Sequence, residues 1–334
     1  MQSIPEVKHI TFPHPPGAGG PGTFQTRFEN ELKKKAWVVS YADKKAKPDI
    51  VFVVGGTRKL LWLWKMKRKG IPIIYRLDGI PWLHRKKKTS FKTYIKVELM
   101  IMINKLIHGF LASHIVYQSE FVKKWWDQES WHPRKDFDII YNAVPIPTYE
   151  KQNKIQEKRL VVLEGVVDYT PYAVKLLNDL ASTLPEDISI EIYGKFEDKT
   201  EQNKLVERLQ YKGFVARKDV DKVLKGAVYL SLDINPACPN TVIEAMAQGS
   251  PVVAFDTGAL PELVKKNCGK IIDYGSNPWN LDYPDVNKLS IAITSVFSDY
   301  DYFAKHAYQY AQSKFNLNQM TKSYLSIMNN LIEV

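Results

Sequence analysis

Residues Asn235–Gly249 read NPACPNTVIEAMAQG, and residues Ser250–Val264 continue with SPVVAFDTGALPELV. The first stretch is a loop rich in proline and asparagine that leads into a helical pattern. The second begins with an apolar run typical of a buried strand, passes through a Thr257-Gly258 turn, and predicts a helix that starts at Pro261. This order of loop, helix, strand, turn and helix predicts an α/β domain.

The start of the first helix predicts a phosphate site. Asn240 and Thr241 occupy its first turn, where backbone N–H groups are unpaired and the helix dipole is positive. Glu244 follows one turn later on the same side, so its carboxylate can accept hydrogen bonds from a ribose diol. The same residues also fit an ordinary N-capped helix with a solvated glutamate, and spacing by itself does not exclude that.

Short β-rich runs alternate with helical stretches along most of the chain. The predicted strands cover residues 7–12, 37–41, 50–54, 71–77, 114–118, 137–141, 160–163, 188–193, 213–215, 228–232 and 251–255. The predicted helices cover residues 24–35, 59–68, 91–111, 120–127, 172–184, 202–209, 219–225 and 241–248, and the tail 286–331 is mainly helical. Such alternation is typical of parallel sheets. We therefore predict two doubly wound, Rossmann-like α/β domains that face each other across a cleft.

The proline-containing polar segment Val144–Gln156 (VPIPTYEKQNKIQ) predicts a linker between the domains. We expect an N-terminal domain of residues 1–145 and a C-terminal domain of residues 146–314. The last helix, at about residues 315–334, is expected to pack back on the first domain. In doubly wound sheets, ligands bind beyond the carboxyl ends of the strands, close to the point where strand order reverses.

Charge and cysteine content restrict the class of protein. The 334 residues contain 47 lysine and arginine residues and 36 carboxylates, a net charge of +11, which favours anionic partners such as phosphates, acidic lipids or nucleic acid. Two cysteines, Cys238 and Cys268, form no metal-binding or disulfide pattern and suit a reducing cytosol. Met1–Lys8 does not resemble a signal peptide, and Val97–Ala112 is too short and too polar to span a bilayer. We expect a cytoplasmic protein that is soluble or peripheral at a membrane.

From Asn235 to Val264 the chain resembles the family 4 retaining glycosyltransferases of the GT-B fold. That family has a helix containing E-A-M-A-x-G, a strand P-V-V-A and a turn of the form T/G-G-x-P-E, and this sequence matches nearly throughout. Weaker similarities are the glycine-rich PHPPGAGGPGT near the start, YNAVP, IYGK and KGFVAR. The resemblance implies a nucleoside diphosphate sugar as donor, no cofactor and no bound metal.

Carried onto this sequence, the resemblance implies a role for several residues of the C-terminal domain. Glu244 matches the second glutamate of the family's E-x7-E motif, which binds the donor ribose, and Asn240 and Thr241 fall close to the phosphates. The first glutamate would fall at Pro236, so that half of the motif is missing and its role passes to backbone groups, to a neighbour such as Asp233, or to no residue.

A second departure from the family concerns the charge around the diphosphate. The family has an arginine and a lysine after the first strand of this domain, whereas this sequence reads LEGVVDYTPYAVK with no basic residue before Lys175. A diphosphate in a semi-buried site needs compensating charge. The nearest candidates are Lys195, together with Gly194 before it in the donor site, and Arg217. Each of the two basic residues also fits an exposed, solvated base.

Two features of the N-terminal half are similar to the family's reacting centre. Gly19 and Gly20 lie in the glycine-rich loop that, by resemblance, covers the sugar and the diphosphate; an ordinary turn explains them equally well. Asp78 ends a predicted strand where the family commonly has a histidine that contacts the transferred sugar. Its carboxylate can bind a sugar hydroxyl or act on the acceptor, or the Asp-Gly pair simply makes a turn.

The densest basic run, Arg85–Lys96 (RKKKTSFKTYIK), precedes an apolar helix. A run of this kind is usually a solvated face. It also suits an acidic membrane surface or, with its aromatic residues, a nucleic-acid backbone.

We therefore expect a retaining glycosyltransferase that acts on a saccharide or lipid-linked acceptor in cell-surface glycan assembly, at the inner face of a membrane. Two alternatives stay open. One is a glycosyltransferase that modifies nucleic acid bases, as in viral DNA. The other is a non-catalytic nucleotide-sugar-binding partner subunit, suggested by the missing glutamate and the missing bases.

Overall fold

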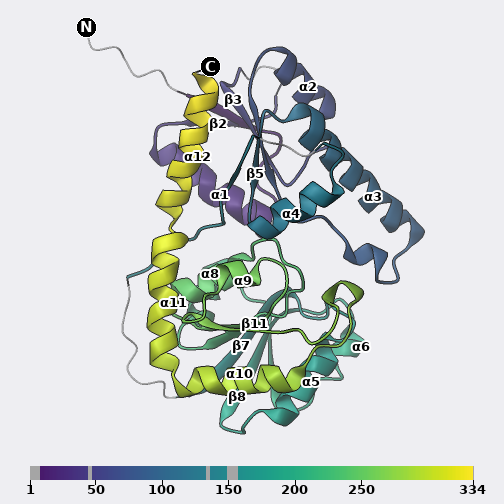
Figure 1. The fold of residues 1–334 in the computed structure, drawn as a ribbon, viewed down its shortest axis with the longest axis vertical. Coiled ribbons are helices and arrows are strands. Elements are labelled where there is room, and N and C mark those ends of the chain that lie inside the picture. Colours follow the sequence, from purple (N-terminus) through teal and green to yellow (C-terminus); the bar gives the residue numbers. More distant parts are fainter. Residues whose placement is uncertain (1–7, 44–46, 133–135, 149–156, 334) are drawn as a thin grey trace. The chain divides into compact units, whose positions relative to one another are not determined.

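The computed structural model describes residues 8–43, 47–132, 136–148 and 157–333. It separates into two compact units, each built around its own sheet (Figure 1). Unit 1 comprises Met1–Asn142 and Leu317–Val334, and unit 2 comprises Ala143–Asn316. Two expected segments lie outside the described residues: residues 1–7 of the expected N-terminal domain and residues 149–156 of the expected linker.

Unit 1 contains a six-stranded parallel sheet in the order β2-β1-β3-β4-β5-β6. Its strands are β1 (His9–Phe12), β2 (Val38–Tyr41), β3 (Ile50–Val54), β4 (Ile73–Leu77), β5 (His114–Tyr117) and β6 (Phe137–Ile139). The central strands β3 and β4 are almost wholly buried because helices cover both faces, which explains the continuous apolar run of β3. The one charged residue of β4, Arg76, is paired with Asp78. Strand order reverses between β1 and β3.

The helical segments of unit 1 are α1 (Gly19–Lys34), α2 (Leu60–Arg68), η1 (Leu83–Arg85), α3 (Phe91–Leu106), η2 (Ile107–Leu111), α4 (Glu120–Glu129) and α12 (Leu317–Ile332). The last helix, α12, is part of this core although it follows unit 2 in the sequence. Its Tyr324 is fully buried, with ring centroids 5.6 Å from Phe24, 4.9 Å from Phe28 and 5.4 Å from Phe52. Figure 1 shows α12 beside α1.

Unit 2 contains a second six-stranded parallel sheet, in the order β12-β11-β10-β7-β8-β9. Its strands are β7 (Lys158–Val166), β8 (Ile188–Lys195), β9 (Leu209–Gly213), β10 (Val228–Leu230), β11 (Val252–Phe255) and β12 (Gly269–Ile272). Strand order reverses between β7 and β10, so the ligand crevice is expected where those two strands end.

The helical segments of unit 2 are α5 (Ala173–Thr183), α6 (Lys199–Gln202), η3 (Arg217–Asp219), α7 (Val220–Leu224), α8 (Asn240–Ala247), α9 (Leu260–Leu263), η4 (Pro278–Asn280), α10 (Val286–Ser298) and α11 (Tyr300–Lys314). Most residues of α8 are buried, which accounts for the apolar side chains on both sides of Glu244 in VIEAMA. Among the described residues, no helix has both the length and the apolar content needed to cross a membrane.

The predicted helix 202–209 is wrong. Only α6 is helical here, and β9 begins at Leu209, before the predicted strand 213–215. The Asn178 amide explains the difference: it donates to the Lys204 carbonyl at 2.8 Å and accepts from the Val206 N–H at 3.1 Å. These contacts with α5 hold the intervening chain in a turn. The short strand β12 was not predicted.

Candidate functional site

The reversal of strand order in unit 2 brings two carboxylates together. Glu164 lies near the end of β7, and Asp233 follows β10. The Glu164 Oε1 atom accepts a hydrogen bond from the Leu232 N–H at 3.0 Å, which ties the end of one strand to the loop after the other. Since ligands bind at this reversal in doubly wound sheets, these carboxylates lie where the donor diphosphate was predicted.

Burial changes the protonation of this pair. Loss of solvent raises the pKa of Asp233 to about 6. The pKa of Glu164 lies well above its usual range, first because of burial and second because of the nearby Asp233 charge. The pair therefore retains a proton at mildly acidic pH. A protonated carboxyl can donate a hydrogen bond to a phosphate oxygen, whereas a carboxylate repels it.

The predicted ribose-binding glutamate is buried at the second turn of α8. Glu244 is 3% exposed, and both of its oxygens accept hydrogen bonds from the Arg217 guanidinium, with Nη1 3.1 Å from Oε2. No side chain caps α8, whose N-cap is Pro239. Arg217, predicted to bind the diphosphate, is thus paired with the very carboxylate that was predicted to bind the ribose.

The other predicted phosphate-binding residues lie at the carboxyl end of β8. The Lys195 ammonium lies over the Phe214 ring, 4.8 Å from its centroid. Gly194 has φ of 141°, and a Cβ there would lie 2.3 Å from the Glu164 carbonyl oxygen, so only glycine fits. Gly194 therefore has a structural function, the close packing of β8 on β7.

The loop before α8 is fixed by the Thr257-Gly258 turn. The Asn235 N–H lies 3.4 Å from the Thr257 hydroxyl oxygen, and Asn235 itself has a left-handed φ of 53°. A Cβ at Gly258 would lie 2.5 Å from the Pro236 nitrogen. Pro236, which stands where the family's first glutamate would be, is therefore packed against backbone.

Unit 1 has its own crevice at the reversal between β1 and β3. A hollow of about 200 Å³ is lined there by Pro13, His14, Pro15, Gly17, Ala18, Pro21, Gly22, Gln25, Val54 and Gly56. The His14 Nε2 atom lies 2.9 Å from the Thr57 hydroxyl and links the loops that follow the two strands. Burial, and then the Lys59 charge, lower the pKa of His14, so its ring is neutral at pH 7.

The predicted glycines Gly19 and Gly20 form the first turn of α1, beside this hollow. Gly19 needs its positive φ of 79°, but a Cβ there would meet no atom within 4 Å. The crowded glycine is Gly22, where a Cβ would lie 1.7 Å from the Gly17 carbonyl oxygen. The sequence showed a run of glycines but not which of them is packed against the loop.

Asp78 lies just beyond β4, as predicted, and its carboxylate has internal partners. The Arg76 Nη1 donates to Asp78 Oδ1 at 3.0 Å, and the Gln118 amide donates to the same oxygen. Burial raises the pKa of Asp78, and the Arg76 charge opposes that shift. A Cβ at Gly55 would lie 2.3 Å from Asp78 Oδ2, so this second oxygen lies tightly against the loop after β3.

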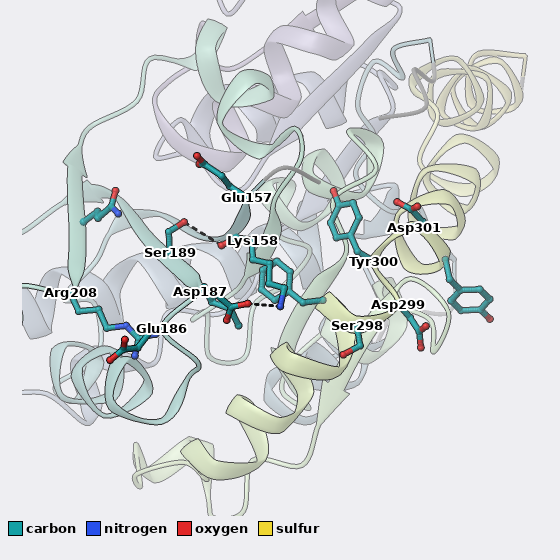
Figure 2. Close-up of a pocket in the computed structure, with 14 residues that line it drawn as sticks. Glu157, Lys158, Glu186, Asp187, Ser189, Arg208, Ser298, Asp299, Tyr300 and Asp301 are labelled. Carbon is teal, nitrogen blue, oxygen red and sulfur yellow. Dashed lines mark hydrogen bonds and ion pairs between the residues drawn. The ribbon is translucent and has the colours of Figure 1, made fainter. Parts of the chain in front are cut away.

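A larger hollow of about 840 Å³ lies in unit 2, at the opposite edge of the sheet (Figure 2). Lys158 and Ile188, which begin β7 and β8, line it together with Tyr300 at the start of α11. The Lys158 ammonium is paired with Asp187 at 2.6 Å. Amino ends of strands are not where ligands of such sheets bind.

In the described part of the chain, no three His, Cys, Asp or Glu side chains are grouped so as to hold a metal ion.

Comparison with known proteins gives one family match, which lies within unit 2. Residues 159–299 match the family model described as Glycosyl transferases group 1. No curated protein matches the sequence.

Solved structures share the fold over nearly the whole chain. One is HepE from Anabaena in complex with UDP-glucose, with 15% identity, TM-score 0.70, and coverage of 97% of this chain and 100% of that one. Another is sucrose-phosphate synthase from Thermosynechococcus elongatus, with 12% identity, TM-score 0.75, and coverage of 98% and 99%. A third, TarM, has 17% identity and TM-score 0.64 over 92% of this chain and 58% of that one. These likenesses confirm the predicted fold of two Rossmann-like parallel-sheet domains.

Proposed function

We propose that this chain, whose residues 159–299 match the family model of group 1 glycosyltransferases, transfers a sugar from a nucleoside diphosphate sugar to an acceptor hydroxyl with retention of configuration. Residues 146–314 form the donor domain in this proposal. Residues 1–145, with the helix at about 315–334, form the acceptor domain. The match to the family model contains α8 and Glu244, and the HepE structure was solved with UDP-glucose, which supports a nucleotide sugar as donor.

The observation that carries the proposal is the burial of Glu244 on α8, in the segment that matches the family. An unpaired carboxylate is costly to bury, so its position needs a partner that donates hydrogen bonds. Arg217 is that partner in the structure. A ribose diol offers the same kind of donors. When the donor binds, the Arg217 guanidinium can turn toward the diphosphate while the ribose takes its place.

In this mechanism, positioning and charge stabilisation supply the rate. The first turn of α8, with Asn240 and Thr241, and the base Lys195 at the end of β8 stabilise the departing diphosphate. Asp78 orients the acceptor or the transferred sugar, and the loop containing Gly19 and Gly20 covers the reacting groups. The leaving phosphate assists the acceptor hydroxyl, so no covalent nucleophile and no metal ion are required.

A specific observation favours a second candidate, a non-catalytic nucleotide-sugar-binding subunit. Glu164 and Asp233 occupy the reversal of strand order, where the family has bases. Tight binding of a donor with no turnover for any acceptor would establish this alternative.

We further propose that the acceptor is a saccharide or a lipid-linked saccharide of cell-surface glycan assembly. The protein would act in the cytoplasm as a peripheral protein at the inner face of a membrane, through the basic segment Arg85–Lys96. A nucleic acid acceptor is the alternative that the same basic segment allows.

The test is a binding and hydrolysis screen of the full chain against UDP-, GDP-, ADP- and TDP-sugars. A matched Glu244→Ala variant is run in parallel. One preferred donor, hydrolysed slowly by the wild type and bound poorly by the variant, is the expected result. Absence of binding to every donor would refute the proposal, and equal binding by the variant would remove Glu244 from the site.

A further inference from the structure

The positive charge of the chain is concentrated in one segment of unit 1. The whole chain has 47 lysine and arginine residues and 36 carboxylates. Fourteen of these basic residues, but only two of the carboxylates, Asp78 and Glu98, fall between residues 58 and 111. The remainder of the chain is therefore close to neutral, and the basic character belongs to the region of α2, η1 and α3.

Helix α3 in this segment has an exposed apolar stripe. Of its sixteen residues, all of them described, only Ile101 is buried. Apolar side chains recur every three or four residues along α3 and into η2, a spacing that aligns them on one side of a helix. The exposed members are Phe91 (80%), Ile95 (42%), Leu99 (49%), Met102 (42%) and Phe110 (50%).

The stripe continues onto α2. Leu61 is 76% exposed and Trp64 is 45% exposed. A hollow of about 370 Å³ lies between the two helices, lined by Leu60, Leu61, Trp64, Leu106, Phe110 and Leu111. Figure 1 shows α2 and α3 on the side of unit 1 away from α12. The stripe and the hollow together form one apolar face, which we call the α2–α3 face.

Basic side chains border the α2–α3 face. The exposed ones on α2, η1, α3 and the adjoining loops are Arg58, Lys65, Lys67, Arg68, Lys69, Arg85, Lys86, Lys88, Lys92 and Lys96. The single carboxylate of α3, Glu98, is neutralised locally. Arg85 Nε lies 2.6 Å from Glu98 Oε1 and His84 Nε2 lies 2.8 Å from the same oxygen, and hydrogen bonding to Arg85 lowers the pKa of Glu98 to about 2. Asp78 is paired with Arg76 in the same way, so both carboxylates between residues 58 and 111 have a basic partner.

We infer that the α2–α3 face is an interfacial surface for a bilayer with anionic headgroups. The apolar stripe enters the boundary between headgroups and acyl chains, and the bordering lysines lie at the level of the lipid phosphates. This inference rests on the proposed function, in which the protein acts at the inner face of a membrane. It assigns the contact to α3 and α2, and makes the run Arg85–Lys96 one border of the surface.

The composition of the α2–α3 face argues against two other partners, a second copy of the chain and nucleic acid. A second copy of the chain would bring two strongly basic faces together, and like charges oppose such a self-complementary interface. Nucleic acid binds basic grooves with aromatic rings for stacking, but it has no use for the exposed aliphatic side chains Ile95, Leu99 and Met102. A bilayer surface matches both properties at once.

The experiment measures sedimentation of the full chain with vesicles. One set is phosphatidylcholine alone, and the other contains about one third phosphatidylglycerol, which supplies the anionic surface. The test variant is Phe91→Ser with Leu99→Ser. The control is Ile291→Ser, since Ile291 is 71% exposed on α10 of unit 2 and lies outside the face. Thermal unfolding and donor binding without vesicles verify that each variant is folded.

We expect the wild type to bind the anionic vesicles and not the neutral ones. The double variant should lose about a hundredfold in partitioning, because each of its two substituted apolar side chains contributes on the order of a factor of ten. Ile291→Ser should bind as the wild type does.

No binding of the wild type to anionic vesicles would overturn the inference, and so would equal binding by the double variant. If the wild type binds no vesicles but self-associates, and the double variant does not self-associate, the face is an interface between copies of the chain. Binding to duplex DNA that matches vesicle binding in strength and ignores the stripe substitutions would assign the charge to nucleic acid. Because donor binding is measured without vesicles, a failure of the proposed function is seen separately.

Discussion

The pairing of Glu244 with Arg217 allows a quantitative prediction. Glu244 is 3% exposed, whereas the Arg217 side chain is 49% exposed. Removing one partner of a fully buried ion pair costs about 3–5 kcal/mol, because a charge is left buried and uncompensated. Since water reaches the arginine side of this pair, we expect Arg217→Ala to lower the free energy of unfolding by about 1–3 kcal/mol.

A double-mutant cycle in urea isolates the interaction. Glu244→Gln removes the charge that Arg217 neutralises, so Arg217→Ala should cost much less in that background, with a coupling of at least about 1 kcal/mol. Lys218→Ala is the matched control, since Lys218 is the exposed neighbour of Arg217 on η3. Additive effects of the two substitutions would refute the pairing as a source of stability.

The same variants separate the two functions that Glu244 and Arg217 are proposed to have. Calorimetric titration with nucleoside and with nucleoside diphosphate should show that Glu244→Ala weakens both by ~1–3 kcal/mol, because both contain the ribose. Arg217→Ala should weaken binding of the diphosphate more than that of the nucleoside. Equal losses for Arg217→Ala would show that it does not contact phosphate, and unchanged affinities for Glu244→Ala would refute the ribose contact.

Three further predictions concern other parts of the fold. The pKa of Asp233 is raised to about 6, and the neutral carboxyl favours an anionic diphosphate, so donor affinity should fall as the pH rises through 6. Asp233→Asn should flatten this pH dependence in a titration with a nucleotide sugar. An unaltered pH profile in the variant would contradict the prediction. Gly194→Ala should destabilise unit 2 by about 2–3 kcal/mol in urea unfolding, while Gly165→Ala, with open space at its Cβ position, should stay within ~1 kcal/mol of wild type. Tyr324→Ala should lower the free energy of unfolding by about 3–5 kcal/mol, because the buried ring is lost, whereas Tyr302→Ala, at an exposed position, should lower it by less than ~1 kcal/mol. Similar losses for the two variants would show that the packing of Tyr324 in unit 1 is unimportant for stability.

Much of the fold could be predicted because each signal was local. The apolar runs of β3, β10 and β11 are short and bounded by polar turns, so period and length identify them as buried strands. The failure at residues 202–209 arises from a tertiary contact, the Asn178 amide, that no local pattern contains. Helix propensity there is overridden by hydrogen bonds from another element.

The candidate site was predicted less completely, because sheet order determines it. Glu164 and Asp233 are far apart in the sequence, and they meet only because β10 pairs with β7. The pairing of Arg217 with Glu244 likewise depends on η3 lying beside α8, which spacing along the chain cannot show. The one local signal for the carboxylate pair was Glu164, which directly follows the predicted strand 160–163.

The placement of α12 has a consequence for synthesis of the protein. Unit 2 is continuous in sequence, whereas unit 1 needs its last helix to surround Tyr324 with Phe24, Phe28 and Phe52. While the chain emerges from the ribosome, unit 2 can fold as soon as it is complete, but the aromatic cluster of unit 1 stays open to water until α12 has been made. A premature stop at residue 317 would therefore damage the half of the protein that is made first.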